Sequence, residues 1–266
     1  MGEDAPMSVT YASYLRLDEL LALQQPREGT LEHDETLFIV IHQVYELWFK
    51  EMLHELDRLM ALLRANDTPP ALHTLKRVLT ILKVLVAQID ILETMTPLEF
   101  LSFRERLEAG SGFHSFQFRE LECVLGVKSR AALERYAAGS THRARVERRL
   151  QAPTLWDAFL AYLALNGYAV PQRALARDVT QPVEADAAVQ GVLIEVYRKN
   201  PTVALVCERM IDFDEGFMEW RYRHVKMVQR TIGTKRGTGG TAGAEYLLTT
   251  INRPAFPDLW AIRAEL

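Results

Sequence analysis

The longest uninterrupted helical pattern in the chain limits what it can fold into. Between Thr36 and Leu63, apolar side chains recur at three- and four-residue intervals, and neither proline nor glycine interrupts them. This spacing puts the apolar groups on one face of a long α-helix, which must bury that face against other helices. The segment Asn66-Asp-Thr-Pro-Pro70 predicts the end of this helix.

The same periodicity continues along most of the chain. Prolines, glycines and capping residues predict further helices over 71–94, 96–107, 116–124, 153–165, 182–200 and 201–232. The stretch from Lys128 to Leu150 is rich in arginine and alanine, and we expect it to be more exposed. No useful strand pattern, internal repeat or linker divides the chain. The sequence therefore predicts an all-α fold, with residues 1–266 forming a single domain of long antiparallel helices.

Composition argues against several classes of protein. The formal net charge of −4 over 266 residues disfavours a general nucleic-acid binder. The apolar runs are too short to span a bilayer, and the first residues lack the apolar core of a signal peptide. Cys123 and Cys207 form no CxxC pattern, which disfavours a disulfide framework and fits a reducing cytoplasm.

Two histidines lie in aromatic helical segments where a hydrated, charged imidazole is unexpected. His42 lies in FIVIHQVYELWF and His224 in WRYRHVKM, and neither has a second His or Cys at chelate spacing. Single imidazoles in such surroundings suit haem, which brings most of its own ligands. From spacing alone, a core histidine bonded to a backbone carbonyl is the commoner explanation of His224, and packing explains His42 equally well.

Three further features have a functional and an ordinary interpretation. Arg104 on an apolar helix is either a surface residue with a buried stem or, in a pocket, a clamp for a carboxylate. The glycine run GTGGTAG at 237–243 follows a helix rather than a strand, so it predicts a connector or a lid, not a dinucleotide site. The basic residues between Arg221 and Arg236 form either a solvated helix face or partners for haem carboxylates.

Longer segments carry a more specific signal than the isolated histidines. FIVIHQVYELWFKEML, MTPLEFLSFRE, SGFHSFQFRELE, WRYRHVKMVQRTIG and GTGGTAG resemble the tryptophan 2,3-dioxygenase family in its bacterial form, in the same order from about Tyr11 to Leu248. The resemblance implies an all-helical, cytoplasmic enzyme that binds one haem b per subunit and forms a homotetramer, a dimer of dimers. It implies conversion of L-tryptophan and O2 to N-formyl-L-kynurenine, the first step of tryptophan catabolism by the kynurenine pathway.

The resemblance also assigns roles to individual residues. His224 would be the axial ligand of the haem iron, and His42 would hydrogen-bond the indole N–H, either as a base or, as we favour, only to orient the ring. Phe38 and Phe100 would surround the indole of the substrate. Arg104 would bind the carboxylate, Thr238 would contact the carboxylate and the ammonium group, and Ser111 would lie near the haem edge. Tyr11 and Tyr14, in the N-terminal segment 1–20, would reach the substrate pocket of a neighbouring subunit.

A few positions depart from the family pattern, and three different functions compete with the one that the resemblance implies. The departures are Thr241 and Ala242 in the glycine loop, Phe100 where tyrosine also occurs, and His114 where glutamine is common. A non-catalytic haem sensor would explain the two histidines but not the Arg104 and Thr238 pair. The remaining two functions are those of an indoleamine 2,3-dioxygenase with a broader substrate range and of a haem-free helical interaction protein.

Overall fold

The fold is built from helices. The computed structural model describes residues 8–26, 32–108, 110, 112–235 and 244–266, and these ranges contain no β-strand, which confirms the predicted all-α class. No helix in this part of the chain is both long and apolar enough to cross a bilayer. The α-helices are α1 (Tyr11–Leu15), α2 (Leu17–Leu21), α3 (His33–Arg64), α4 (Thr68–Leu92), α5 (Pro97–Arg104), α6 (Phe116–Val124), α7 (Thr141–Gln151), α8 (Leu155–Leu165), α9 (Gln172–Leu175), α10 (Ala187–Lys199), α11 (Pro201–Ile232), α12 (Ala244–Ile251) and α13 (Pro257–Ala261). The 3-10 helices are η1 (Glu105–Leu107), η2 (Gly112–His114), η3 (Arg130–Arg135) and η4 (Ile262–Ala264).

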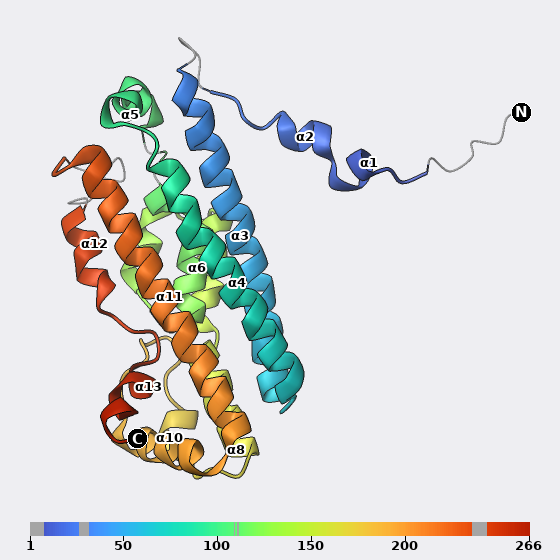
Figure 1. Ribbon diagram of the computed structural model, residues 1–266. Coiled ribbons are helices and arrows are strands. Elements are labelled where there is room, and N and C mark those ends of the chain that lie inside the picture. The colour runs from blue at the N-terminus through green and yellow to red at the C-terminus, as the bar shows by residue number, and fades with distance from the viewer. Residues whose placement is uncertain (1–7, 27–31, 109, 111, 236–243) are drawn as a thin grey trace, which may run out of the picture.

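Three long helices, α3, α4 and α11, form the body of the bundle, and α4 packs against both of the others (Figure 1). The contacts between α3 and α4 run in opposite order along the two helices. The Tyr45 hydroxyl donates to the Leu85 carbonyl oxygen at 2.7 Å, and further along α3 the Glu55 carboxylate pairs with Arg77 at 2.6 Å. These two helices are therefore antiparallel, as expected for the predicted helical bundle.

Local signals in the sequence set several helix ends. Asn66 has a positive φ of 56° just beyond α3. The Thr96 side chain accepts from the backbone N–H of Glu99, and the Glu99 carboxylate accepts from the backbone N–H of Thr96 at 2.6 Å, so α5 begins with a capping box. Asn200 caps α11 by accepting from the backbone N–H of Val203 at 3.2 Å. These ends lie close to the predicted ones.

Two predicted helices are shorter than expected. The range 182–200 becomes helical only at Ala187, because the Asp186 side chain caps the helix there and its backbone N–H is held by the buried carboxylate of Asp258 at 2.8 Å. The range 96–107 leaves the α-helical form after Arg104 and continues as η1. A tertiary contact thus decides where α10 begins.

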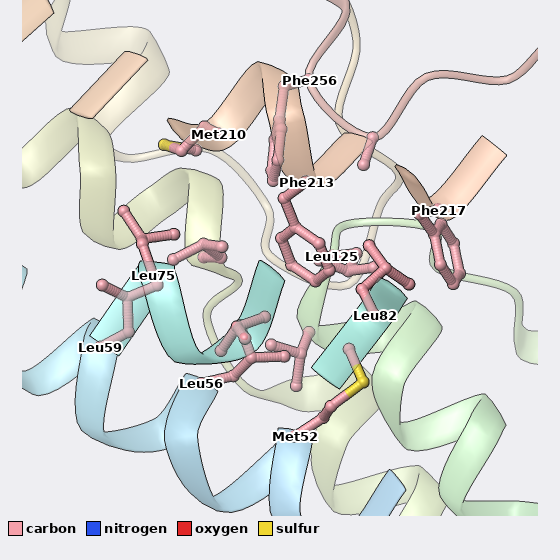
Figure 2. Close-up of a cluster of buried hydrophobic side chains, with 14 of the residues drawn as sticks. Met52, Leu56, Leu59, Leu75, Leu82, Leu125, Met210, Phe213, Phe217 and Phe256 are labelled. Carbon is pink, nitrogen blue, oxygen red and sulfur yellow. The ribbon is translucent and has the colours of Figure 1, made fainter. Parts of the chain in front are cut away.

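The hydrophobic core joins the three long helices to α6, α8, α10 and α13. Gly216 in α11 lets α11 approach α4 closely, because a Cβ at this position would come within 2.8 Å of Leu82. Burial of each large apolar side chain there contributes about 1.5–3 kcal/mol. Figure 2 shows part of this cluster, with Met52, Leu56, Leu59, Leu75, Leu82, Leu125, Met210, Phe213, Phe217 and Phe256 labelled.

The stretch from Lys128 to Leu150 is less exposed than expected, so that expectation is wrong in part. It forms η3 and α7, and its apolar residues build a second cluster with Cys123. Lys128 is itself buried and donates to three backbone carbonyl oxygens around the end of α7, at 2.6–2.9 Å. The high arginine content hid this packing, since arginine can bury its stem beside such a cluster while its charged group stays near water.

Helices α1 and α2 extend away from the bundle (Figure 1). Tyr11 and Tyr14 are 76% and 77% exposed, and several leucines of this segment are exposed as well. Within the described residues, the segment is joined to α3 by hydrogen bonds of Gln43, which accepts from the Gln24 amide and donates to the Leu23 carbonyl oxygen. The N-terminal helices therefore present apolar side chains that the described part of the chain leaves exposed.

Candidate active site

A cavity lies at the end of the bundle where α3 begins and where α4 and α11 end. Helices α5, α6 and α12 complete its walls, and its lining is mostly apolar. The fold brings together five of the expected site residues in this cavity: Phe38, His42, Phe100, Arg104 and His224. They come from α3, α5 and α11, which are far apart in the sequence.

His42 lines the cavity from α3. Its Nδ1 atom lies 2.7 Å from the backbone carbonyl oxygen of Phe38, one helical turn earlier. Burial lowers the pKa of His42, so its imidazole is neutral near pH 7. A neutral ring that donates Nδ1–H to a carbonyl keeps its lone pair on Nε2. The local hydrogen bond therefore leaves Nε2 as an acceptor for a ligand.

His224 lines the cavity from α11. Burial is the main cause that lowers the pKa of His224 to about 4, and the nearby His42 and Arg119 act in the same direction. The imidazole of His224 is therefore neutral near pH 7 and can offer a nitrogen lone pair to a metal ion. The described residues contain no cluster of three or more His, Cys, Asp or Glu side chains that could hold a metal ion by themselves. A metal bound at His224 would need most of its ligands from a cofactor.

Aromatic side chains form one wall of the cavity. The ring centroids of Phe38 and Phe100 are 5.9 Å apart, and each contacts the buried Phe103 at about the same distance. Tilted and edge-on contacts are the preferred geometries of aromatic pairs, and each contributes about 0.5–1.5 kcal/mol beyond the burial of its surface. This wall stands beside His42, whose ring centroid lies 4.0 Å from that of Phe38. The cavity therefore presents an aromatic, apolar wall beside His42.

Arg104 is the last residue of α5, and its half-buried side chain lines the cavity. The sequence left two interpretations of Arg104 open, a surface residue with a buried stem and a carboxylate clamp in a pocket. Its position in the cavity lining favours the second. A guanidinium in an apolar surrounding binds a carboxylate through two parallel hydrogen bonds.

The sequence patterns did not reveal a charged group in the cavity wall. Arg119 and Glu122, on one face of α6, pair at 2.5 Å, and Arg221 of α11 lies 3.7 Å from the same carboxylate. Arg221 also donates to the carbonyl oxygens of Thr250 and Arg253, so it fixes the end of α12 against the cavity. The available signal was the three-residue spacing in FQFRELE, which puts Arg119 and Glu122 on one helix face.

Arg119 keeps part of its hydrogen-bonding capacity. The side chain is nearly buried, its guanidinium lies 4.9 Å from the centroid of the Phe118 ring, and one Nη donates to Glu122. Its Nε is buried and makes no hydrogen bond within the described residues. A buried arginine with unused donors is costly unless a ligand supplies an acceptor.

The basic cluster near the end of α11 is mostly a surface feature. Arg221 is buried in the cavity wall, whereas Arg223 pairs with Asp90 and Glu93 on α4 and its flank. Lys226 and Arg230 are exposed. The interpretation as a solvated face therefore applies to most of the cluster, and Arg221 is the exception.

The remaining four expected site residues are not among the described lining of this cavity. Tyr11 and Tyr14 are on α1, away from the cavity of their own chain (Figure 1). Ser111 and Thr238 lie outside the described residues, as do Thr241 and Ala242 of the glycine loop. The structure therefore places five of the nine expected contacts in one cavity.

Comparison with known proteins identifies the family. The family model described as tryptophan 2,3-dioxygenase matches residues 2–163 and 170–266. The chain is similar to the tryptophan 2,3-dioxygenase of Herpetosiphon aurantiacus, with 63% identity over 97% of this chain and 99% of that protein. It is also similar to those of an Anaeromyxobacter species, at 57% identity over 97% of both chains, and of Caulobacter vibrioides, at 43% identity over 97% of this chain and 98% of the other. Its length, its two cavity histidines and this similarity lead to one conclusion: the chain belongs to the tryptophan 2,3-dioxygenase family.

Proposed function

We propose that the chain is a haem-dependent dioxygenase that converts L-tryptophan and O2 to N-formyl-L-kynurenine, the first step of tryptophan catabolism. Family membership supports the reaction and the cofactor. The observation that carries the proposal is the pair of neutral imidazoles, His42 from α3 and His224 from α11, that line one apolar cavity. Both oxygen atoms of O2 enter the product, so the reaction needs no external reductant.

The donor chemistry of the cavity fits haem. His224 would hold the haem iron, because its neutral imidazole offers a lone pair and the cofactor would bring most of the other iron ligands. Arg119 would receive a haem carboxylate, because it lines the cavity and its buried Nε makes no hydrogen bond within the described residues. When bound, haem supplies the iron that takes up and activates O2.

His42 orients the substrate in this proposal. Its Nε2 accepts a hydrogen bond from the indole N–H, while Phe38 holds Nδ1 and fixes the tautomer. Proton removal is disfavoured, because an indole N–H is a very weak acid and burial makes His42 a weaker base than a free histidine. The residue therefore positions the C2–C3 bond of the indole rather than changing its charge.

Separate residues bind the two ends of the substrate, the carboxylate and ammonium groups at one end and the indole at the other. Arg104 binds the carboxylate, Thr238 assists with the carboxylate and the ammonium group, and Phe38 and Phe100 enclose the indole. Ser111 is proposed to lie near the haem edge. An apolar wall of this kind keeps water from the reacting atoms and strengthens the polar contacts that remain.

We further propose that residues 1–266 form one domain and that the protein is a cytoplasmic homotetramer, a dimer of dimers. The exposed Tyr11 and Tyr14 of α1 would reach the pocket of a neighbouring subunit, which would cover their apolar surface. Two buried, free cysteines fit a reducing compartment. Light scattering of the purified protein should give the mass of four subunits, and a monomer would contradict this assembly.

The proposed reaction is tested with the haem-loaded protein. The haem is reduced without oxygen, L-tryptophan and then O2 are added, and N-formylkynurenine is measured by chromatography. Formation of one product molecule per O2 consumed supports the proposal. Haem-loaded protein that binds O2 without product would instead support a sensor, and protein that takes up no haem would support an interaction protein. Equal turnover of tryptamine would indicate the broader indoleamine activity.

A further inference from the structure

Gly112 lies directly against the ring of His42. It begins η2, the short 3-10 helix that precedes α6, and it lines the cavity. A Cβ at this position would lie 3.6 Å from Cδ2 and 3.7 Å from Nε2 of His42. Chain neighbours aside, it would meet no other atom of the described residues within 4 Å. A side chain here would therefore touch the Nε2 edge of the imidazole first.

The fold itself does not require glycine at position 112. Its φ is outside the left-handed region, so an L-residue adopts this backbone without strain, and 3.6 Å is an ordinary van der Waals contact. Gly126 shows the contrast, because its φ is 88° and a Cβ there would approach Val183 to 2.5 Å. Neither backbone conformation nor crowding by the described structure explains the glycine at 112.

The His42 ring has one nitrogen available for a ligand. Nδ1 is held by the Phe38 carbonyl oxygen at 2.7 Å, so the ring cannot turn to present its other edge without losing that bond. Any ligand that hydrogen-bonds His42 must reach Nε2, and the space beside Nε2 is the space that Gly112 leaves open. The fixed tautomer therefore leaves the Nε2 lone pair free to accept a hydrogen bond, and Gly112 leaves the space beside that atom open.

We propose that Gly112 is a specificity-determining residue that keeps the Nε2 edge of His42 open for the N–H edge of a flat indole substrate. This inference rests on the proposed function and adds a residue to it. A methyl group at 112 would occupy part of the space in which the substrate N–H approaches Nε2. The substrate would then lose either its hydrogen bond or its fit against the aromatic wall.

The Gly112→Ala variant tests this proposal through binding as well as activity. In the haem-loaded protein, the Kd for L-tryptophan, followed by the change in the haem absorption band or by calorimetry, should rise about tenfold, as expected for a crowded pocket. Haem content and the midpoint of thermal unfolding should stay at the wild-type values, because the added methyl group fits the fold. Binding of carbon monoxide, which is small, should change less than twofold.

Two further variants separate the proposed effect from general damage. Gly191→Ala in α10 is the matched control, because a Cβ there meets nothing within 4 Å, and it should leave the Kd unchanged. In a His42→Ala background, Gly112→Ala should raise the Kd less than twofold, because the space of the missing ring lets the indole shift.

The outcomes that overturn the proposal are distinct from failure of the proposed function. A Gly112→Ala protein with a wild-type Kd for L-tryptophan would show that the space beside Nε2 is not used. Loss of haem from this variant, or an equal effect with and without His42, would also overturn it, since the methyl group would then act elsewhere. Failure of the proposed function itself would already be seen in the wild-type protein, as absence of haem or of product.

Discussion

The imidazole of His224 stacks on the indole of Trp220, one helical turn earlier in α11, with ring centroids 5.2 Å apart and planes 7° apart. Trp220 is held in turn by Phe118 at 5.1 Å and by Tyr45 at 6.2 Å. No ring nitrogen of His224 has a hydrogen bond to another described residue. Aromatic packing, rather than a hydrogen-bonded carboxylate, therefore sets the plane of this imidazole.

Replacement of His224 by alanine should abolish stable haem incorporation, because the imidazole nitrogen that would hold the iron is lost while the cavity remains. The measurement is the haem absorption band of the purified protein relative to its protein absorbance. His42→Ala is the comparison, since it should slow turnover and keep haem. A full, unchanged band in His224→Ala would remove its assignment as ligand, and loss of haem in His42→Ala alone would reverse the two assignments.

Replacement of Arg104 by leucine should weaken transition-state binding by about 2–5 kcal/mol, the scale for removing one partner of a buried charge pair. The variant keeps a side chain of moderate size at the end of α5, so haem content should be retained. Steady-state kinetics with L-tryptophan give the change in kcat/KM. The kcat/KM for tryptamine, which has no carboxylate, should fall much less in this variant. Wild-type kinetics in Arg104→Leu would place this side chain outside the substrate site.

Replacement of Arg119 by leucine should lower the affinity of the apoprotein for haemin about tenfold, because a buried charge-assisted hydrogen bond to a haem carboxylate is lost. Haemin dimethyl ester, in which both carboxylates are blocked, should bind the variant and the wild-type protein alike. Arg148→Leu, at an exposed position on α7, is the control and should change neither affinity. An equal loss for haemin and its ester would mean that Arg119 supports the wall through Glu122 instead.

The stability of the protein should depend on pH through Lys128. Burial lowers the pKa of Lys128 from 10.5 to about 8, so between these values the unfolded chain binds more protons than the folded one. The free energy of unfolding should therefore increase as the pH rises from about 8 to 10.5. As the pH falls back through about 8, this added stability is lost. The wild-type advantage over Lys128→Met in urea unfolding should be larger at about pH 9.5 than at about pH 7.5.

Lys128→Met also leaves three carbonyl oxygens around the end of α7 without their donor, so it should cost about 2 kcal/mol at neutral pH. Lys76→Met, which removes an exposed lysine of α4, should have almost no effect at either pH. The wild type and Lys128→Met should differ more in their free energies of unfolding at the higher pH. If this difference stays constant or shrinks as the pH rises, the ammonium group is not in a buried environment.

Much of the fold could be predicted because its signals are local. The uninterrupted periodicity of 36–63 predicts α3, and the Thr96 capping box and the Asn200 cap mark the starts of α5 and α11. The stretch after Lys128 could not be predicted in this way, because its few apolar residues become a core only when α6 packs against α7. The start of α10 depends on Asp258, more than 70 residues away in the chain.

The sequence by itself determined the helical class, several helix ends and, through its long motifs, the family. Only the tertiary structure decided that His42 and His224 line one cavity, that Arg119 and Arg221 enter its wall, and that Gly112 faces Nε2. Hydrophobic periodicity indicates which face of a helix is buried, but it does not indicate which other helix packs against that face. The neutral state of both imidazoles is likewise a property of the folded protein, because desolvation by neighbouring helices lowers their pKa values.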